Sequence, residues 1–417
     1  MNVPPPKILI IGLHFTPEAT GNAPYTTALA AGLVAQGRAV QVITGPPHYP
    51  EWRIREGYGG WMEKETIRGV PVRRLRHYVP SAPGSIKRLL SELSFGVRTA
   101  CVPWGKPDVV LLVSPALFSS LVVTLRIRLS RRRIPVGVWV QDIYSLGVTE
   151  AGSSGRLVAG VVKAIESFVL RSASGVSVIH ERFRETAIER LGVSRSKITV
   201  IRNWSHMTVP TTTDRADRAV TRATLGWSDE IVVLHAGNMG AKQGLENVIE
   251  AAREADRRGV GVRFILLGDG NQRAQLEALS SGIDRVQFMA PVADEDFYAA
   301  LCSADVLLVN EKPGVTEMSV PSKLTSYFTT GRPVLAATEP GSVTANEIEV
   351  SGGGVTVAAG DPRALLDAAL ELGRDVDEGE RLGRNGLAFR REMLDEKSAV
   401  TRFGGWLEKI SRATSDD

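Results

Sequence analysis

The chain has 417 residues, which is long enough for two domains that each bury a core of their own. Its hydrophobic content of 43% and charged content of 23% are ordinary for a globular protein, and its two cysteines, Cys101 and Cys302, lack the spacing of a metal site. The formal net charge of +4 hides an asymmetry, because residues 1–205 contain 27 Lys and Arg against 13 Asp and Glu, whereas residues 206–417 contain 23 against 33. The basic half is therefore expected to meet a membrane surface, a nucleic acid or a phosphorylated substrate.

The amino terminus has neither the basic nor the apolar region of a secretory signal, so a cytoplasmic protein is expected. The most apolar stretch, Val109 to Leu125, is interrupted by Ser114, Pro115 and further hydroxyl residues, and it falls short of a membrane span. A buried strand over Val109–Ser114, followed by a helix that begins near Pro115, explains this stretch better.

Apolar runs of strand length alternate with runs of helical periodicity along the first half of the chain. The predicted strands are Lys7–Gly12, Ala39–Thr44, Val109–Ser114, Val136–Gln141 and Gly175–Ile179. A loop through Thr16–Asn22 and a helix over Tyr25–Gln36 separate the first two strands. Such alternation predicts a parallel, doubly wound sheet.

A polar, proline-marked segment, His206–Arg218, is predicted to be a linker, after which the alternation begins again. The predicted strands of the second half are Ile231–Ala236, Arg263–Leu267, Val286–Met289, Val306–Val309 and Val334–Ala337. The expected fold is α/β, with two doubly wound, Rossmann-like domains over residues 1–205 and 206–399.

Three segments of the second half predict a site for the phosphates and ribose of an activated sugar. The turn Gly237 to Gly244 lies between a strand and a helix, where free N–H groups and the helix dipole favour a phosphate. Gly268-Asp-Gly270 is a second turn of the same kind. Lys323 follows Ser322 in the first turn of a helix, where a cation is unfavourable unless an anion is bound. Ordinary βα turns and a solvated lysine remain the alternatives for these segments.

Order and spacing of these segments resemble retaining glycosyltransferase family 4, in the branch of colanic-acid and O-antigen biosynthesis. The resemblance rests on Gly237-Asn-Met-Gly-Ala-Lys-Gln-Gly-Leu-Glu246, on Pro321-Ser-Lys-Leu324 and on Gly331-Arg-Pro-Val334. Phe15-Thr-Pro-Glu18 and Pro47-His-Tyr-Pro-Glu-Trp52 extend it to the first half. It implies the GT-B fold, with a cleft between the domains and with a last helix, within 400–417, that returns to the first domain.

The resemblance also implies where a nucleotide-sugar binds. The expected diphosphate-binding residues are Gly21, Asn22, Gly237, Asn238, Lys242, Gln243, Ser322 and Lys323. The expected base, ribose and sugar residues are Gly268, Asp269, Gly270, Val292, Glu317, Met318 and Ser326. The chain departs from the family's pattern, because Asn238 replaces a common arginine and Lys242 lies one residue before the usual lysine position, which Gln243 occupies. Met318 and Ser326 occupy the positions of the family's two glutamates, so ribose recognition is expected to be altered.

Three residues of the first half are candidates for catalysis. Gln141 and Asp142 follow a buried strand, and Asp142 could orient the acceptor or accept its proton. His180 follows the strand Val176–Ile179. An aspartate that caps a helix or turn is the alternative for Asp142. No metal site, no metal ion and no cofactor are expected, since cationic side chains and helix termini stabilise the leaving diphosphate in this fold class.

Apolar residues recur at helical spacing over Ile86–Arg98 with basic residues beside them, and Arg126, Arg128 and Arg131–Arg133 form a second basic cluster. Such segments predict a peripheral contact with the inner face of the cell membrane, although core helices with solvated arginines would give the same pattern. No nucleic-acid motif is present.

The function expected from these observations is transfer of a sugar from a nucleoside diphosphate, preferably UDP, to a polyprenyl-diphosphate-linked or other saccharide. The resemblance favours deoxysugars such as fucose or N-acetylfucosamine. A sugar-nucleotide epimerase and a non-catalytic partner-binding subunit remain alternatives. A nicotinamide dehydrogenase is disfavoured, because the first strand leads into Gly12-Leu-His-Phe15 and not into Gly-x-Gly-x-x-Gly.

Overall fold

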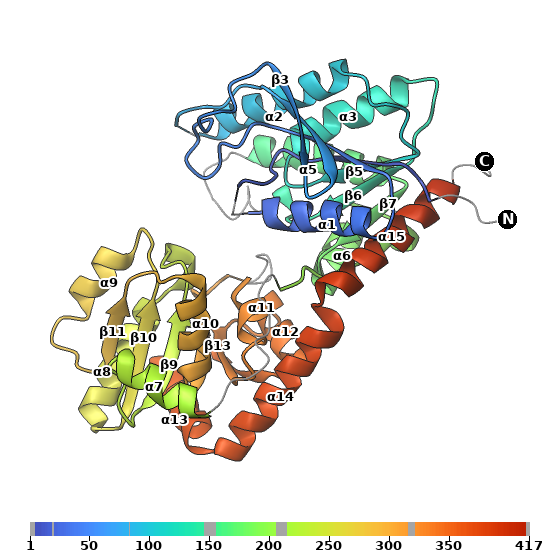
Figure 1. Ribbon diagram of the computed structural model, residues 1–417. Coiled ribbons are helices and arrows are strands. Elements are labelled where there is room, and N and C mark those ends of the chain that lie inside the picture. Colours follow the sequence, from blue (N-terminus) through green and yellow to red (C-terminus); the bar gives the residue numbers. More distant parts are fainter. Residues whose placement is uncertain are drawn as a thin grey trace. The chain divides into compact units, whose positions relative to one another are not determined.

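A computed structural model describes residues 5–18, 21–82, 84–145, 156–205, 215–315 and 322–413. It divides the chain into two compact units. Unit 1 comprises Met1–Asn203 and Glu396–Asp417, and unit 2 comprises Trp204–Asp395. Each unit consists of one sheet with helices packed against it (Figure 1).

The sheet of unit 1 has the strand order β3-β4-β2-β1-β5-β6-β7-β8. In chain order its strands are β1 (Ile8–Ile11), β2 (Val40–Thr44), β3 (Met62–Ile67), β4 (Val70–Leu75), β5 (Val109–Val113), β6 (Val136–Val140), β7 (Gly175–Val178) and β8 (Ile198–Val200). All neighbouring pairs are parallel except β3 and β4. The central strands are buried runs of Val, Ile and Leu, as expected where helices cover both faces.

The helices of unit 1 lie on both faces of its sheet. They are α1 (Ala23–Ala35), α2 (Ser85–Cys101), α3 (Leu117–Leu129), α5 (Arg156–Ser172), α6 (Glu181–Glu189) and α15 (Glu396–Ala413), with a 3-10 turn η1 (Arg195–Lys197). Helices α2, α3 and α5 bury their apolar sides in one core with β5, β6 and β7. Helix α15 runs beside α1 (Figure 1), and Phe403 of α15 packs on Trp139 of β6.

Gly404 and Gly405, which lower the intrinsic helix propensity of this part of the chain, lie inside α15. A Cβ at Gly404 would approach the Arg38 guanidinium to 2.7 Å. The absence of a side chain thus leaves room for Arg38, which donates a hydrogen bond to Glu408 one turn further along. Tertiary packing therefore outweighs the low helix propensity of glycine.

The sheet of unit 2 has the order β11-β10-β9-β12-β13-β14, and all of its neighbouring pairs are parallel. Its strands are β9 (Ile231–Ala236), β10 (Val262–Leu267), β11 (Val286–Met289), β12 (Val306–Asn310), β13 (Val334–Thr338) and β14 (Gly354–Ala358). Its helices are α7 (Arg215–Thr224), α8 (Glu246–Arg258), α9 (Arg273–Leu279), α10 (Asp294–Ser303), α11 (Ser322–Tyr327), α12 (Val343–Ser351), α13 (Pro362–Arg374) and α14 (Val376–Met393), with a 3-10 turn η2 (Ala241–Gln243). Helices α8, α9 and α13 bury residues in one core, and α10, α11, α12 and α14 bury residues in a second core.

Several predicted boundaries differ from the structure. Helix α7 begins at Arg215, within the segment predicted to be a linker, and Arg218 binds the carbonyl of Ser303 instead of lying in a free connection. Helix α1 begins at Ala23, two residues earlier than predicted, with Pro24 in its first turn. The apolar stretch after Val109 is the strand β5 and the helix α3. In the part of the chain that the structure describes, no helix has the length and apolar character needed to cross a bilayer.

Candidate functional site

The carboxyl ends of β9 and β12 mark the position in unit 2 where a ligand is expected. The chain proceeds from β9 to β10 and β11 on one side, and then returns to β12 on the other side of β9. Doubly wound sheets bind ligands in the crevice at such a switch point. The predicted diphosphate residues of unit 2 that the structure describes follow β9 or lie on α11, whose Leu324 and Tyr327 pack in a core with β9 and β12.

The turn after β9 is built closely against the turn after β10. A Cβ at Gly268 would lie 2.1 Å from the carbonyl oxygen of Gly237, and Gly268 has a φ of +136°, so only glycine fits there. Hydrogen bonds join the turns as well, from Met239 N to Asp269 O (2.8 Å) and from Gln272 N to Met239 O (3.0 Å). The predicted residues Gly237 and Gly268 are thus brought into direct contact.

Asn310, at the end of β12, fixes the other side of the same turn. Its Nδ2 donates to the carbonyl oxygens of Gln243 (2.7 Å) and Gly244 (2.9 Å), and its Oδ1 accepts from Asn247 Nδ2 (2.9 Å). The side chain is buried, so these bonds satisfy groups that water does not reach. Sequence analysis missed this residue, although a lone amide at the end of the apolar run Val306–Val309 is a usable signal.

The polar side chains of the turn differ in orientation. Asn238 and Lys242 are exposed, whereas Gln243 is half-buried and its Oε1 accepts a hydrogen bond from Gly240 N (3.0 Å). Gln243 therefore closes the turn upon itself through its Oε1 atom. The glutamine that stands at the family's usual lysine position thus contributes a hydrogen bond inside the turn.

Lys323 is the half-buried cation next to this turn. Its Nζ lies 3.2 Å from Nε2 of His235, a fully buried residue of β9, and a Cβ at Gly237 would lie 3.1 Å from Lys323 Cε. Burial lowers the pKa of Lys323 to about 8, although the nearby carboxylate of Glu311 acts to raise it. A bound anion would restore the ordinary pKa by favouring the charged ammonium.

Glu311, directly after β12, was not predicted from the sequence. Its carboxylate accepts hydrogen bonds from the hydroxyls of Thr338 and Thr344 (2.6 Å for Thr344), which lie on β13 and α12. These bonds hold the carboxylate at the carboxyl end of the sheet, close enough to interact with Lys323. The switch point of unit 2 thus combines a cation, a carboxylate and a neutral imidazole.

The residues predicted for the base, ribose and sugar are only partly described. Asp269 directs its Oδ1 to Gly270 N (2.8 Å) within its own turn. Val292 is 37% exposed and Ser326 is half-buried on α11. Glu317 and Met318 lie outside the described residues, and Ser322 is described only as the start of α11.

Unit 1 has a corresponding switch point between β1 and β5. Gly21 precedes Asn22, whose Nδ2 donates to the carbonyl oxygen of Ser114 (2.9 Å) and so joins the start of α1 to the end of β5. The backbone carbonyl of Asp142, after β6, accepts from Ser114 Oγ (3.1 Å), and the Asp142 side chain is exposed. Asn22, Ser114 and Asp142 therefore lie together at the carboxyl edge of this sheet.

Gln141 and His180 are less accessible than the sequence suggests. Gln141 is buried, and its Oε1 accepts a hydrogen bond from Asn203 Nδ2 (2.7 Å). His180 is completely buried at the start of α6 and packs against Phe183 at a ring separation of 4.3 Å. Burial, assisted by the charges of Arg202 and Arg182, lowers the pKa of His180 to about 3, so its imidazole is neutral at physiological pH.

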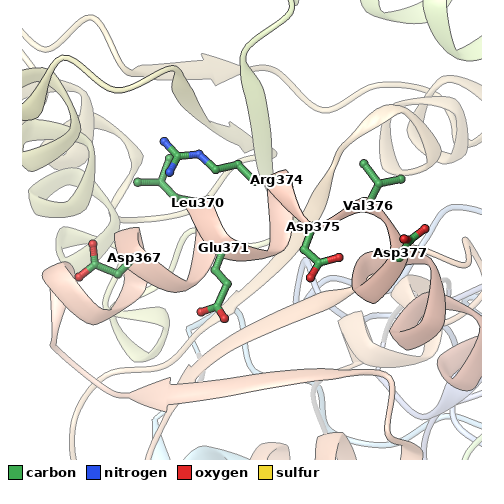
Figure 2. A pocket seen from close by; sticks show the side chains of 7 residues that line it. All are labelled: Asp367, Leu370, Glu371, Arg374, Asp375, Val376 and Asp377. Carbon is green, nitrogen blue, oxygen red and sulfur yellow. The ribbon is translucent and has the colours of Figure 1, made fainter.

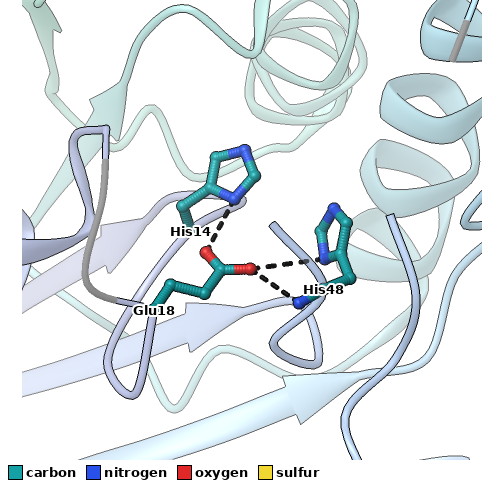
Figure 3. Close-up of side chains that lie close together, drawn as sticks. All are labelled: His14, Glu18 and His48. Atoms are coloured by element: carbon teal, nitrogen blue, oxygen red, sulfur yellow. Dashed lines mark hydrogen bonds and ion pairs between the residues drawn. The ribbon is translucent and has the colours of Figure 1, made fainter. Parts of the chain in front are cut away.

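A histidine cluster lies at the carboxyl ends of β1 and β2 (Figure 3). His14 Nδ1 lies 2.8 Å from Glu18 Oε2, and Glu18 Oε1 accepts the backbone N–H groups of His48 (2.7 Å) and Tyr49 (2.9 Å). Burial alone would raise the pKa of Glu18, but these bonds lower it below its ordinary value. Two imidazoles and a carboxylate are donor types that metals accept, and their ligand atoms lie within 4.8 Å of one another.

The same atoms are, however, already engaged within the protein. Both carboxylate oxygens of Glu18 accept hydrogen bonds, and the Nδ1 atom of His48 lies 2.8 Å from the carbonyl oxygen of Pro46. Glu18 therefore ties the loop after β1 to the loop after β2. His14 takes part through its side chain and His48 through its backbone N–H group.

A surface depression on α13 and α14 does not suit the expected ligand (Figure 2). Its polar lining consists of Asp367, Glu371, Asp375, Asp377 and Arg374. Four carboxylates against one guanidinium repel a diphosphate. The candidate site is therefore placed at the switch points and not in this depression.

Comparison with known proteins assigns the chain to a class. The family described as "Glycosyl transferase 4-like domain" matches residues 20–204, and "Glycosyl transferases group 1" matches residues 230–375. The putative colanic acid biosynthesis glycosyl transferase WcaI of Escherichia coli (strain K12) is 35% identical over 337 residues, which cover 78% of this chain and 81% of that protein. The chain therefore belongs to the glycosyltransferases of the GT-B, family 4 type, as the sequence motifs predict.

Further relatives agree with this assignment. The probable glycosyltransferase WbjE of Pseudomonas aeruginosa is 27% identical over 275 residues, or 64% of this chain and 66% of that protein. Anabaena Alr3699/HepE, solved in complex with UDP, has a TM-score of 0.72 at 16% identity and covers 97% of this chain and 100% of its own. The sucrose-phosphate synthase of Thermosynechococcus elongatus has a TM-score of 0.72 at 18% identity, with coverages of 98% and 100%. These structures share the fold, and the predicted α/β architecture of two parallel-sheet domains is confirmed.

Proposed function

We propose that this glycosyltransferase moves a sugar from a nucleoside-diphosphate donor, preferably a UDP-linked deoxysugar such as fucose or N-acetylfucosamine, to a lipid-linked saccharide of a surface polysaccharide. The observation that carries the donor assignment is the Lys323 ammonium beside the Gly237 turn at the switch point of unit 2. Support comes from the colanic acid assignment of WcaI and from the UDP complex of HepE.

In this proposal Lys323 and the backbone N–H groups of the turn after β9 stabilise the charge that develops on the leaving diphosphate. The sugar is transferred with retention of configuration, the acceptor attacks from the face that the diphosphate leaves, and neither a metal ion nor a cofactor takes part. Asp142, exposed after β6, orients the acceptor hydroxyl or accepts its proton. Buried His180 and Gln141 support unit 1 around it.

The acceptor is proposed to reach the enzyme at the inner face of the membrane. Helix α2 exposes Ile86 (76%), Leu90 (48%) and Val97 (52%) beside the exposed cations Lys87 and Arg88. An amphipathic basic helix binds anionic lipid through apolar burial and electrostatic attraction.

The second predicted basic cluster contributes less to this surface. Arg126 donates to the carbonyl oxygens of Thr99 and Val102 (2.9 Å each) and lies over the Trp104 ring, so its charge is directed inward. Arg128, Arg131 and Arg133, at the end of α3 and directly after it, are exposed and remain candidates for lipid contact.

Three assays test the proposal. Purified protein is titrated with UDP and GDP, and UDP-sugars are then incubated with polyprenyl-diphosphate-linked saccharides while UDP release is recorded. Release that depends on the lipid acceptor is expected, whereas a folded protein that binds neither nucleotide would contradict the proposal. Flotation with anionic vesicles tests the membrane contact, with Ile86→Asp expected to reduce binding and Val350→Asp, at a 55% exposed site of unit 2, serving as control.

A further inference from the structure

His235 differs from every residue that the sequence motifs single out, because it is a fully buried imidazole on the central strand of unit 2. Its Nε2 lies 3.2 Å from Nζ of Lys323, whereas its strand neighbours Leu234 and Ala236 are buried in a hydrophobic core. A buried polar side chain near the end of a strand costs stability unless it has a hydrogen-bond partner. Here one partner is the cation of the candidate site, and backbone hydrogen bonds to Asn238 and Leu308 also act on the ring.

The protonation state of this pair follows from chemistry. An ammonium group can only donate hydrogen bonds, so Nε2 of His235 must be the acceptor and must carry no proton. Complete burial and the adjacent charge of Lys323 hold the pKa of His235 well below its ordinary value, which is consistent with a neutral ring. Among the described residues, the titratable groups that interact with Lys323 are thus His235 from β9 and Glu311 from the end of β12.

This arrangement fixes a flexible side chain. Lysine loses rotamer entropy when it is held in one conformation, and its three N–H donors can be shared between partners. One donor is directed to His235, while Cε packs against Gly237. The cation that the turn itself contributes, Lys242, is exposed on η2, and no buried side chain among the described residues restrains its conformation.

We infer that His235 is a positioning residue of the donor site: its Nε2 accepts a hydrogen bond from Lys323 and holds the ammonium against the Gly237 turn, where the diphosphate binds. The inference rests on the proposed function and adds to it the residue that aims the cation. It also explains why a histidine, and not an aliphatic residue, interrupts the apolar run of β9.

Two substitutions separate positioning from packing. In His235→Gln the side-chain amide oxygen can reach the position of Nε2, whereas in His235→Asn it ends near the position of Nδ1. Both variants are polar, but asparagine is one methylene shorter than glutamine and leaves more space at this buried site, so a control for packing is needed. Leu234→Ala, at the buried neighbour on the same strand, controls for loosening of β9.

The measurement is isothermal titration with UDP at neutral pH, with folding checked by circular dichroism. Loss of a hydrogen bond to a charged group predicts about ten- to hundredfold weaker binding for His235→Asn, and His235→Gln is expected to stay within about threefold of the unsubstituted protein. In a Lys323→Met background the His235→Asn change should alter UDP affinity by less than about twofold, because coupled residues are not additive.

A second readout is the dependence of UDP affinity on pH. The ammonium is charged below the pKa of Lys323, so affinity should be full below about pH 8 and fall above it. Removal of the acceptor in His235→Asn should move this decline to lower pH, which a purely structural role would not do.

The outcomes are distinct. Equal UDP affinity in His235→Asn and His235→Gln, or an equally large effect of His235→Asn with and without Lys323, overturns the inference and leaves the proposed function intact. Failure of the unsubstituted, folded protein to bind UDP or GDP contradicts the proposed function itself.

Discussion

Replacement of Gly268 by alanine tests whether the contact between the two βα turns of unit 2 builds the donor site. The new Cβ would lie 2.1 Å from the carbonyl oxygen of Gly237, whereas such contacts are not tolerated below about 3 Å, so the turns must separate by about 1 Å. A side chain at φ +136° adds backbone strain of about 1–2 kcal/mol, and overpacking adds about 1–3 kcal/mol. We therefore expect Gly268→Ala to lower the free energy of unfolding by about 2–5 kcal/mol.

The same unit offers a matched control. Gly282 also has a left-handed φ of +77°, but a Cβ there would meet nothing within 4 Å. Gly282→Ala should therefore cost only the backbone term, about 1–2 kcal/mol, and leave UDP binding unchanged. Gly268→Ala should in addition weaken UDP binding at least about tenfold, because the turn that carries Gly237 is displaced.

Denaturant unfolding of both variants, followed by UDP titration of the folded proteins, gives the two quantities. Equal unfolding free energies for Gly268→Ala and Gly282→Ala would refute the argument from packing. Unchanged UDP affinity in a folded Gly268→Ala protein would refute the placement of the donor site.

Three further predictions follow from the structure. Asn310→Ala removes the buried donor of the carbonyl groups of Gln243 and Gly244, so it should cost about 1–3 kcal/mol of stability and weaken UDP binding, as measured by unfolding and titration. An unaffected UDP affinity would show that the turn does not need this anchor. Burial raises the pKa of Glu92 to about 8 despite the hydrogen bond from Phe118 N, so the stabilising contribution of Glu92 is complete below about pH 4.5 and is lost as the pH rises through about 8. Over this range the unfolding free energy of Glu92→Gln should decline less than that of the unsubstituted protein, by as much as about 5 kcal/mol. Parallel pH profiles of the two proteins would contradict the assignment. Trp406→Ala removes the ring that α15 packs against β6 and β7, so thermal and denaturant unfolding should show a loss of about 3–5 kcal/mol, and a loss below about 1 kcal/mol would mean that α15 is dispensable for unit 1.

The order of strands β1, β2, β5–β7 and β9–β13 and of the helices between them could be predicted from the sequence, because most of these parallel strands are short apolar runs rich in Val, Ile and Leu. The parallel strands β8 and β14 were not predicted. The β3–β4 ribbon was not predicted. Strand β3 alternates exposed and half-buried residues at the edge of the sheet, and its pairing with β4 depends on a turn at Arg68-Gly69. Local composition alone gives little signal for such an edge.

The residues of the candidate site also fall into two groups: those with a local sequence pattern and those whose partners are distant in the chain. Gly237, Gly268 and Lys323 could be identified because each belongs to a turn or helix start with a local pattern. His235 could not be identified, and Asn310 gave only the signal of a lone amide after an apolar run. Their partners lie 88 and at least 63 residues away and meet them only when β9 and β12 pair. Sequence spacing likewise does not show that Gln243 turns inward to Gly240.

The central claim is that unit 2 binds a nucleoside diphosphate through Lys323, and calorimetric titration tests it most directly. The protein, Lys323→Ala and the charge control Lys64→Ala, at an exposed position of β3, are titrated with UDP, GDP and NAD⁺. We expect saturable binding of one nucleoside diphosphate that weakens at least about tenfold in Lys323→Ala and is unchanged in Lys64→Ala. Absence of UDP and GDP binding by the folded protein, or equal affinity in all three proteins, would contradict this claim.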